Sequence, residues 1–288
     1  MKTLVLGSKG QLGSCLNDQL INSNYEVIFS SREQLDITNS EHTKNKILEI
    51  SPELIINASA YTLVDKAEED KDLANLINNI AVENIAKICN KLGCWLIHIS
   101  TDYVFDGNSR IPYIEDDKTN PQGVYGESKL KGELAIQSSG CKHIIIRTAW
   151  VFSEYGNNFL KTMLRLGAER NELSIVRDQV GCPTYAQDIA RTIIEIIPKL
   201  DLKKNNSLYH YCGDNPCSWY DFANAIFEEA KTNNIKLKSK INSIETSAYP
   251  MPAKRPKFSA LDCSKIENEF GVLASNWHEG IQRALSKL

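Results

Sequence analysis

Tyr125 and Lys129 are the two residues of this sequence whose types and spacing best suit acid–base chemistry. On a helix, side chains four positions apart lie on one face, so Lys129 could stand beside the phenol of Tyr125. A free phenol has a pKa of about 10, and lowering it by about 3 units requires about 4 kcal/mol of preferential stabilisation of the phenolate. A neighbouring ammonium is the simplest source, and a cofactor's positive charge could add to it. The pair therefore predicts a proton donor or acceptor tuned toward neutral pH, although alone it would also suit a solvated helix.

A hydroxyl upstream strengthens this hypothesis. The apolar run 95–99 predicts a buried strand, and Thr101 and Asp102 follow its end. Ligands of open α/β sheets bind at the carboxyl ends of the strands, so Thr101 would project into that crevice. Its hydroxyl could donate to a carbonyl oxygen that gains charge during reduction. A turn or cap hydroxyl is the alternative, and the presence of Tyr125 and Lys129 favours the catalytic interpretation.

The elements that must position these residues alternate between strands and helices. Apolar runs typical of buried strands lie at 3–6, 25–29, 54–56, 95–99 and 143–146, with helical stretches between them. This alternation predicts an α/β fold with a doubly wound, parallel, Rossmann-like sheet. A later helix and strand, expected over 189–197 and 208–211, would complete the sheet.

The regular alternation loosens after about residue 150. There we expect helices over 157–170, 219–230 and 277–285 and a strand over 174–176. We therefore predict an NADP(H)-binding Rossmann domain over residues 1–150 plus about 186–213. A smaller C-terminal α+β substrate-binding domain would span about 151–185 and 214–288.

Three glycines, Gly7, Gly10 and Gly13, directly follow the first predicted strand. A strand, a glycine turn and a helix start form a phosphate cradle, because backbone N–H groups and the helix dipole face the anion. A tight turn without a ligand could have the same spacing. The position of this glycine turn, immediately after the first strand, favours dinucleotide binding.

The end of the second predicted strand bears on the choice between NADPH and NADH. Sites that prefer NAD commonly hold the ribose 2′-hydroxyl with an acid there, whereas this strand runs into Ser30, Ser31 and Arg32. Because the strand does not end in a carboxylate, a 2′-phosphate would meet no repulsion there, and the Arg32 guanidinium could bind it. NADPH is therefore favoured, and Glu33 keeps NADH possible.

Composition excludes several other classes of function. The 288 residues carry a formal net charge of −3, so no basic field would recruit nucleic acid. No apolar run approaches the roughly 18 residues of a membrane helix, and the first residues are too strand-like for a signal peptide. The eight cysteines are scattered without a CxxC pair, which is typical of free thiols in a reducing cytosol. We expect a cytoplasmic protein without a nucleic-acid or membrane partner.

With these residues placed, the chain resembles the dTDP-4-dehydrorhamnose reductase family of the extended short-chain dehydrogenase/reductase superfamily. The resemblance runs essentially from end to end. It is carried by the blocks Gly7-x-x-Gly10-Gln11-Leu12-Gly13, Asn57-Ala58-x-Ala60-Tyr61-Thr62, Ser100-Thr101-Asp102-Tyr103-Val104-Phe105, Tyr125-Gly126-x-x-Lys129, Arg147-Thr148-x-Trp150, Asp178-Gln179-x-Gly181-x-Pro183-Thr184 and Arg255-Pro256. Dehydratases of the superfamily typically place Asp-Glu after the Thr. Here Tyr103 breaks that acid pair, which favours simple reduction.

The resemblance implies a role for each matching residue. Tyr125 would donate the proton and Lys129 would hold the nicotinamide ribose, while Thr101, Asp102 and Trp150 would contact the sugar. A late loop carries Arg255, which would suit a diphosphate. Motifs and resemblance together give the residues expected to hold the cofactor: Gly7, Gly10, Gln11, Leu12 and Gly13 at the pyrophosphate, Ser30 and Arg32 at the second strand, Asp36 and Ile37 at the adenine, and Ala58, Ala60, Tyr61, Thr62, Ile99, Tyr125 and Lys129 along the crevice.

The implied function is NADPH-dependent reduction of dTDP-4-dehydro-L-rhamnose to dTDP-L-rhamnose, in nucleotide-sugar and polysaccharide biosynthesis. Two alternatives stay open: a reductase of another nucleotide-activated keto sugar, and a non-catalytic regulatory subunit like the methionine adenosyltransferase β subunit. Some relatives form magnesium-bridged dimers. Cys15 and Gln187 here are not the carboxylates that such a site needs, so we predict no metal. A homodimer is a possible state of the protein.

Overall fold

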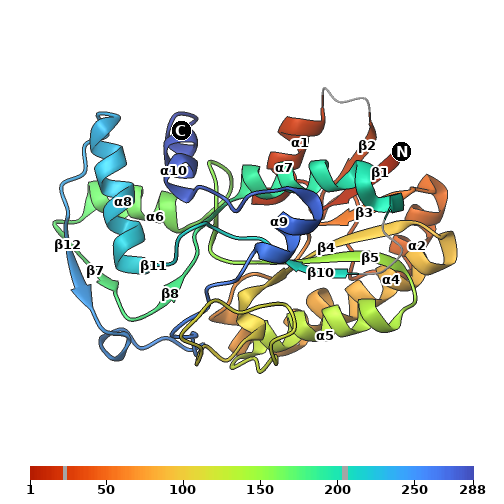
Figure 1. Ribbon diagram of the computed structural model, residues 1–288, viewed down its shortest axis with the longest axis horizontal. Helices are drawn as coiled ribbons and strands as arrows, with labels where there is room; N and C mark the ends of the chain where they lie inside the picture. The colour runs from red at the N-terminus through yellow and green to blue at the C-terminus, as the bar shows by residue number, and fades with distance from the viewer. Residues whose placement is uncertain (22–24, 203–206) are drawn as a thin grey trace.

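The computed structural model describes residues 1–21, 25–202 and 207–288, and a six-stranded sheet forms its centre (Figure 1). The strands lie in the order β2-β1-β3-β4-β5-β10, and every neighbouring pair is parallel. The predicted parallel, doubly wound sheet is therefore confirmed, including its last strand. The strand bounds are β1 Lys2–Leu6, β2 Glu26–Ser30, β3 Leu54–Asn57, β4 Trp95–Thr101, β5 Lys142–Thr148 and β10 Ser207–His210.

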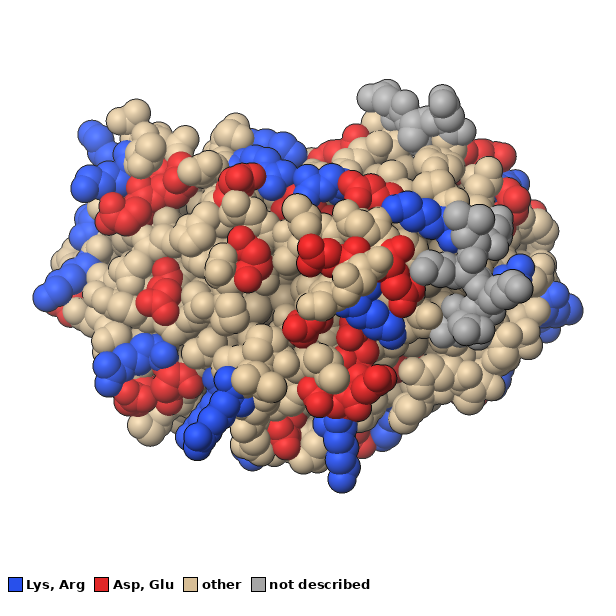
Figure 2. Space-filling view, viewed as in Figure 1, with Lys and Arg blue, Asp and Glu red and all other residues tan. Residues whose placement is uncertain are grey.

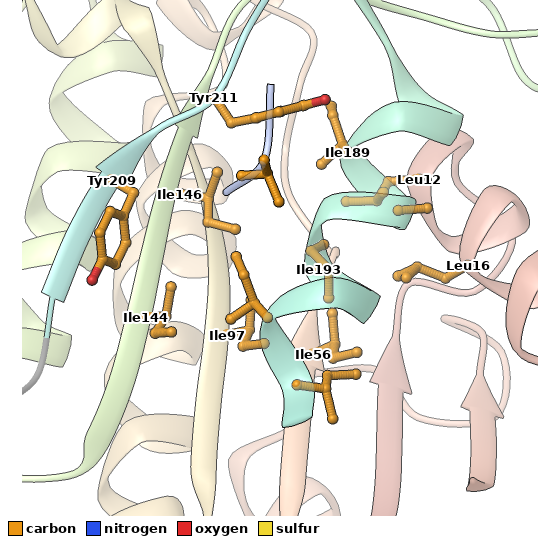
Figure 3. Close-up of a cluster of buried hydrophobic side chains, with 14 of the residues drawn as sticks. Leu12, Leu16, Ile56, Ile97, Ile144, Ile146, Ile189, Ile193, Tyr209 and Tyr211 are labelled. Carbon is orange, nitrogen blue, oxygen red and sulfur yellow. The ribbon is translucent and has the colours of Figure 1, made fainter. Parts of the chain in front are cut away.

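Helices cover both faces of this sheet. One face packs against α1 Gln11–Leu20 and α7 Ala186–Ile196, and the other against α2 Ser40–Ile50, α4 Ala81–Leu92 and α5 Val124–Ser138. Each fully buried aliphatic side chain in such a layer contributes about 1.5–3 kcal/mol. Figure 3 shows the first layer, in which side chains of α1 and α7 meet those of the strands: Leu12, Leu16, Ile189 and Ile193 against Ile56, Ile97, Ile144 and Ile146.

The alternation of side chains along β4 decides which residues can reach α5. Leu96 belongs to the core beneath α4 and α5, whereas Ile97 belongs to the core beneath α1 and α7. Because successive strand side chains point to opposite faces, His98 and Ser100 follow Leu96 toward α5. The buried face of α5 thus meets polar side chains at the carboxyl end of the sheet.

A second group of elements packs to one side of the sheet, at the left of Figure 1. Helices α6 Phe159–Glu169, α8 Trp219–Thr232 and α10 Trp277–Leu285 enclose a separate apolar core with β7 Glu172–Val176 and β12 Lys240–Ile244, which pair in parallel. The division into two domains stays a prediction, and residues 203–206 of its first part lie outside the described residues. Two further short pairs lie outside the central sheet: β6 Val151–Phe152 pairs in parallel with β9 Thr184–Tyr185, and β8 Val180–Gly181 pairs antiparallel with β11 Cys217–Ser218.

Several elements differ from the sequence-based expectation. The helical stretch between β3 and β4 is interrupted, because α3 Lys71–Asn75 runs into a π-helical turn, Leu76–Ile80, before α4 begins. Strand β12 and helix α9 Ser264–Phe270 were not predicted. The remaining short turns are of 3-10 type: Lys66–Glu68, Asp102–Val104, Ile197–Leu202 and Thr246–Ala248.

Charged side chains of both signs are interspersed over the face seen in Figure 2. This mixture agrees with the small formal net charge of −3. In the part of the chain that the structure describes, no helix has the length and apolarity needed to cross a bilayer.

Candidate active site

One face of α5 carries three polar residues toward the interior. Tyr125, Lys129 and Glu133 follow one another at intervals of four and therefore share that face. The side chains of Lys129 and Glu133 are each only 1% exposed, and Tyr125 is partly buried. The helix thus turns a polar stripe toward the sheet, beside its buried apolar residue Ile136.

Lys129 reaches the neighbouring strand β4. Its Nζ donates to the carbonyl oxygen of Ile99 at 2.6 Å and lies 3.2 Å from Nε2 of His98. Burial lowers the pKa of Lys129 to about 8, and the charge of Glu133 opposes that shift. The lysine therefore changes charge near the physiological range of pH.

Glu133 anchors the other end of this stripe. Its carboxylate accepts from Arg147 of β5 through two bonds, Nε to Oε1 at 2.9 Å and Nη2 to Oε2 at 2.6 Å. The hydroxyl of Ser100 donates to the same carboxylate. A bidentate, fully buried ion pair of this kind holds α5 in register against β4 and β5.

Tyr125 differs from the sequence-based expectation in its acidity. Burial raises the pKa of Tyr125 to about 12, a hydrogen bond with Thr101 opposes the rise, and the charge of Asp102 adds to it. The prediction of a Tyr125 pKa tuned toward neutrality is wrong in direction, because desolvation dominates the shift. Lys129 Nζ lies instead against the Ile99 carbonyl oxygen and the His98 ring. Tyr125 is consequently a phenol at neutral pH, which is the form that can donate a proton.

Thr101 and Asp102 lie at the carboxyl end of β4, as predicted. The hydroxyl of Thr101 donates to Asp102 Oδ1 at 3.0 Å and accepts from the backbone N–H of Tyr103 at 3.2 Å. Asp102 is only 1% exposed, and burial raises its pKa to about 6. The ring of Tyr103 packs edge-on against Tyr125, with 5.6 Å between the ring centroids.

The glycine turn after β1 forms a close-packed cradle. Gly7 has a positive φ of 81°, and a Cβ there would lie 2.9 Å from the backbone nitrogen of Ser59. A Cβ on Gly13 would lie 2.2 Å from the carbonyl oxygen of Gly7. Helix α1 begins after Gly10 without a side-chain cap, so its first N–H groups remain available to an anion.

Gln11 has contacts that the sequence did not predict. Its side-chain oxygen accepts from Ser153 at 2.9 Å and from Asn158 at 2.8 Å, and its amide nitrogen lies 3.4 Å from the carbonyl oxygen of Val151. The residue at the start of the cradle therefore also ties α1 to the segment that leads into α6. Leu12, the next residue, points into the core instead.

The residues expected near the second strand lie close together. Ser30 accepts the backbone N–H groups of Gly7 and Ser8 through its carbonyl oxygen, at 3.0 and 3.1 Å. Arg32 is 73% exposed, with its Nε 3.6 Å from Asp36 Oδ2. Glu33 accepts from Lys9 at 3.1 Å, so both cations beside this edge lie near a carboxylate.

The segment after β3 is held by a residue that the sequence did not single out. Asn78, in the π-helical turn, accepts from the backbone N–H of Tyr61 at 2.9 Å and donates to its carbonyl oxygen at 3.1 Å. Its amide also donates to Ser128 of α5 at 3.0 Å. Of the other expected residues, Ala58 and Ala60 are partly buried, Ile37 is buried and Thr62 is exposed.

A cavity of about 970 Å³ lies beside this crevice, between the loop after β4 and the second group of elements. Its lining includes Asp106, Arg255 and Trp219 but neither Thr101 nor Tyr125, so it adjoins the reactive side chains rather than containing them. Arg255 donates to Asp65 at 2.7 Å, and its positive charge opposes the raised pKa of Tyr103.

Trp150 does not line this cavity but contacts Trp219, which does. Its ring stacks on Trp219, with 3.4 Å between the centroids and 6° between the planes. A Cβ on Gly181 would lie 2.6 Å from the Trp150 ring. The expected contact of Trp150 with a sugar stays a prediction, whereas Trp219 reaches the cavity and was not predicted.

Comparison with known proteins gives a consistent result. A family model described as the RmlD substrate binding domain matches residues 1–288. The dTDP-4-dehydrorhamnose reductase of Escherichia coli K12 is 42% identical over 294 aligned positions, which cover 100% of this chain and 98% of that protein. A solved dTDP-4-dehydrorhamnose reductase from Clostridium acetobutylicum superposes with a TM-score of 0.93 at 39% identity, covering 100% of this chain and 99% of that one. One from Bacillus anthracis, solved in complex with NADP, gives 0.92 at 37% identity, again covering 100% and 99%.

Proposed function

The chain belongs to the dTDP-4-dehydrorhamnose reductase family, and from this premise we propose that it reduces dTDP-4-dehydro-L-rhamnose to dTDP-L-rhamnose with NADPH. The observation that carries the proposal is the grouping of Tyr125, Lys129 and Thr101 at the carboxyl end of the parallel sheet. That edge is where open α/β sheets bind their ligands. A binding protein without catalysis would have no need for this set of residues.

The residues around the glycine turn fit a dinucleotide. Gly7 and Gly13 leave no room for a Cβ, so the backbone of the turn packs closely around the N-terminus of α1. That N-terminus has no side-chain cap, and a pyrophosphate would lie against its free N–H groups. Gly10, Gln11 and Leu12 would contact it, and Arg32 would meet a 2′-phosphate. Further along the crevice, the expected contacts are those of Asp36, Ile37, Ala58, Ala60, Tyr61, Thr62, Ile99 and Lys129.

When bound, NADPH supplies the hydride for the C4 carbonyl carbon of the sugar. The protein's own residues would handle the oxygen and its proton. Tyr125, which its pKa of about 12 keeps protonated at neutral pH, would give its proton to the oxygen as negative charge develops there. Thr101 would hydrogen-bond to the same oxygen, and Lys129 would hold the ribose and stabilise the phenolate of Tyr125.

The adjoining cavity would take the rest of the substrate. Its volume of about 970 Å³ falls at the upper end of ligand pockets in general. Arg170, Lys254, Arg255 and Lys257 line it, and cations of this kind suit the diphosphate of a nucleotide sugar. Asp102 and Trp150 would bound the sugar on the side nearest the reactive groups.

The direct test is the loss of NADPH absorbance when purified protein meets the keto sugar nucleotide, generated in place by the upstream enzymes. We expect oxidation that depends on the sugar nucleotide, and slower oxidation with NADH in parallel. An absence of oxidation, with NADPH binding intact by fluorescence, would contradict the proposal. Turnover of a different keto sugar, or a stoichiometric synthetase partner in a pull-down, would then identify which alternative holds.

Two further properties belong to the same proposal. All eight cysteines are free thiols, which supports a cytoplasmic location. A homodimer is proposed from the family resemblance. Light scattering of the purified protein tests that state directly, and a monomeric mass would contradict it.

A further inference from the structure

A buried chain of polar groups runs from Lys129 across two strands of the sheet. Lys129 Nζ lies 3.2 Å from Nε2 of His98 in β4, and the other ring nitrogen, Nδ1, lies 3.1 Å from Nδ2 of Asn57 in β3. Asn57 and His98 are register partners, and both are 0% exposed. No step of the proposed reaction uses either residue, although both are polar and fully buried. Their burial calls for an explanation.

The orientation of the Asn57 amide follows from its other contact. The backbone N–H of Ser59, which can only donate, lies 3.1 Å from Asn57 Oδ1. The amide oxygen must therefore face Ser59, and the NH₂ group must face His98. An NH₂ group only donates, so Nδ1 of His98 has to accept. A neutral imidazole carries one proton, and that proton is then on Nε2.

An Nε2–H group that faces Lys129 has a consequence for the lysine. An ammonium has three donors and no acceptor, so it cannot accept this bond, whereas an uncharged amine can. We propose that Asn57 and His98 are positioning residues that present Nε2–H to Lys129 and so favour the uncharged amine of this lysine over its ammonium. The amine keeps its own bond to the carbonyl oxygen of Ile99, since it still has protons to donate.

The other charged groups around Lys129 act in both directions. Glu133, four residues on, favours the ammonium, and Arg147 of β5 compensates much of the Glu133 charge. Burial of Lys129 favours the amine. Burial of His98 and the neighbouring Lys129 charge lower the pKa of the His98 ring well below its usual value, so the ring stays neutral. Other titratable groups lie on elements that pack against α5 or on α5 itself: Lys66 and Glu68 in the 3-10 turn, Lys71 and Asp72 in α3, Asp102 and Tyr103 after β4, and Tyr125 in α5.

The proposal bears on catalysis only if the proposed reduction is correct. That reaction consumes a proton through Tyr125, and a charged Lys129 stabilises the phenolate that is left. Turnover should therefore fall as Lys129 loses its proton, near its pKa of about 8. A plot of kcat against pH would then decline on its alkaline side, and Asn57 and His98 would set the pH of this alkaline limb.

The first test does not depend on activity. Long-range nitrogen–proton NMR of the full-length protein labelled with ¹⁵N-histidine distinguishes the two neutral tautomers, and the chain has only five histidines. The His98 signal is identified by its loss in His98→Gln. At about pH 9, where the amine form of Lys129 predominates, we expect the Nε2–H tautomer. An Nδ1–H tautomer at that pH would overturn the proposal, whatever the enzyme reduces.

The second test uses two substitutions, each of which replaces the hydrogen-bond donor facing Lys129 by an acceptor. In Asn57→Asp, the carboxylate would accept from Nδ1–H, which leaves Nε2 free to accept from the ammonium. In His98→Gln, the amide oxygen can accept from the ammonium without any added charge. Both variants should move the alkaline limb of kcat upward, by about one pH unit.

His210→Gln is the matched control, because His210 is equally buried in the same sheet but contacts Arg147 and the Tyr113 carbonyl instead of Lys129. Its alkaline limb should stay in place. A shift in Asn57→Asp alone would mean that only added charge matters, and it would refute the role of His98. Equal shifts in all three variants would indicate a general loss of packing and would refute it as well.

Discussion

Glu133→Gln probes the buried polar face of α5 with almost no change in side-chain volume. The Glu133 carboxylate is 1% exposed and the Arg147 side chain 4%, and two hydrogen bonds of 2.9 and 2.6 Å join them. A glutamine would turn an NH₂ group or a neutral oxygen toward the guanidinium and leave a buried charge without its partner. Breaking a buried pair on one side costs about 3–5 kcal/mol.

A second Glu→Gln variant on the same helix separates the loss of the buried ion pair from any effect that Glu→Gln has on the stability of α5 in general. Glu127, on the exposed side of the same helix, pairs with Lys131 at 2.7 Å, and their side chains are 57% and 50% exposed. Such surface pairs contribute about 0.3–0.5 kcal/mol. Glu127→Gln should therefore change the free energy of unfolding about tenfold less than Glu133→Gln.

Urea unfolding of the two variants and the parent protein, followed by tyrosine and tryptophan fluorescence, measures both losses under one condition. A loss below about 1 kcal/mol for Glu133→Gln, comparable with that of Glu127→Gln, would refute the view that this ion pair fixes α5. Because the charge of Glu133 raises the pKa of Lys129, the same variant should also move the alkaline limb of activity to lower pH.

Four further outcomes are expected. Tyr125→Phe should lower kcat by about 10²–10⁴-fold, since it removes the proton donor, while NADPH fluorescence titration gives an unchanged Kd; near-normal turnover would exclude the role. Asp102→Asn should raise the unfolding free energy by up to about 3 kcal/mol at alkaline pH. Burial raises the pKa of the folded carboxyl from 3.8 to about 6, so the destabilisation is absent below the lower value and complete above the higher one; a gain that does not depend on pH would contradict this cause. Gly13→Ala should abolish NADPH binding, because its Cβ would lie 2.2 Å from the Gly7 carbonyl oxygen; unchanged binding in a titration would contradict the cradle. Arg32→Ala should raise KM for NADPH about tenfold and leave KM for NADH unchanged, and an equal change in both would exclude a contact with the 2′-phosphate.

The sheet and its helices could be predicted because their signal is local. Runs such as 54–56 are apolar without interruption, and Leu54, Ile55 and Ile56 are all 0% exposed. A strand covered on both faces needs this pattern, so it is visible without any knowledge of its neighbours. The glycine turn is visible as a spacing of three glycines directly after a strand. Gly13 is required by contacts within the turn, whereas a Cβ on Gly7 would meet Ala58 and Ser59, which follow β3.

The polar interior beneath α5 could not be predicted in the same way. Periodicity treats Lys129 and Glu133 as solvent-facing residues, and their buried state depends on partners contributed by β4 and β5. Those partners are set by strand register, which brings His98 beside Asn57 and Ser100 beside Arg147. The direction of the Tyr125 pKa shift was wrong for the same reason, because desolvation by the surrounding fold was not visible in a spacing of four residues.

Elements with a weak apolar pattern were also missed. Strand β12, Lys240–Ile244, has only two apolar residues, Ile241 and Ile244, and is at most partly buried, so it gains its structure by pairing with β7. Asn78 shows no local signal either, although its amide joins the Tyr61 segment to α5. In both cases the stabilising partner is distant in the sequence.

The measurement that bears most directly on the central claim is the fate of the transferred hydride. NADPH deuterated at the transferred position of C4 would be incubated with the full-length protein and the keto sugar nucleotide, and the purified product examined by proton NMR. We predict one deuterium at C4 of a dTDP-linked 6-deoxy sugar, formed in equal amount to the NADPH consumed. Deuterium at another carbon, or NADPH consumption without a reduced sugar nucleotide, would contradict the assignment of this chain as a C4 keto reductase.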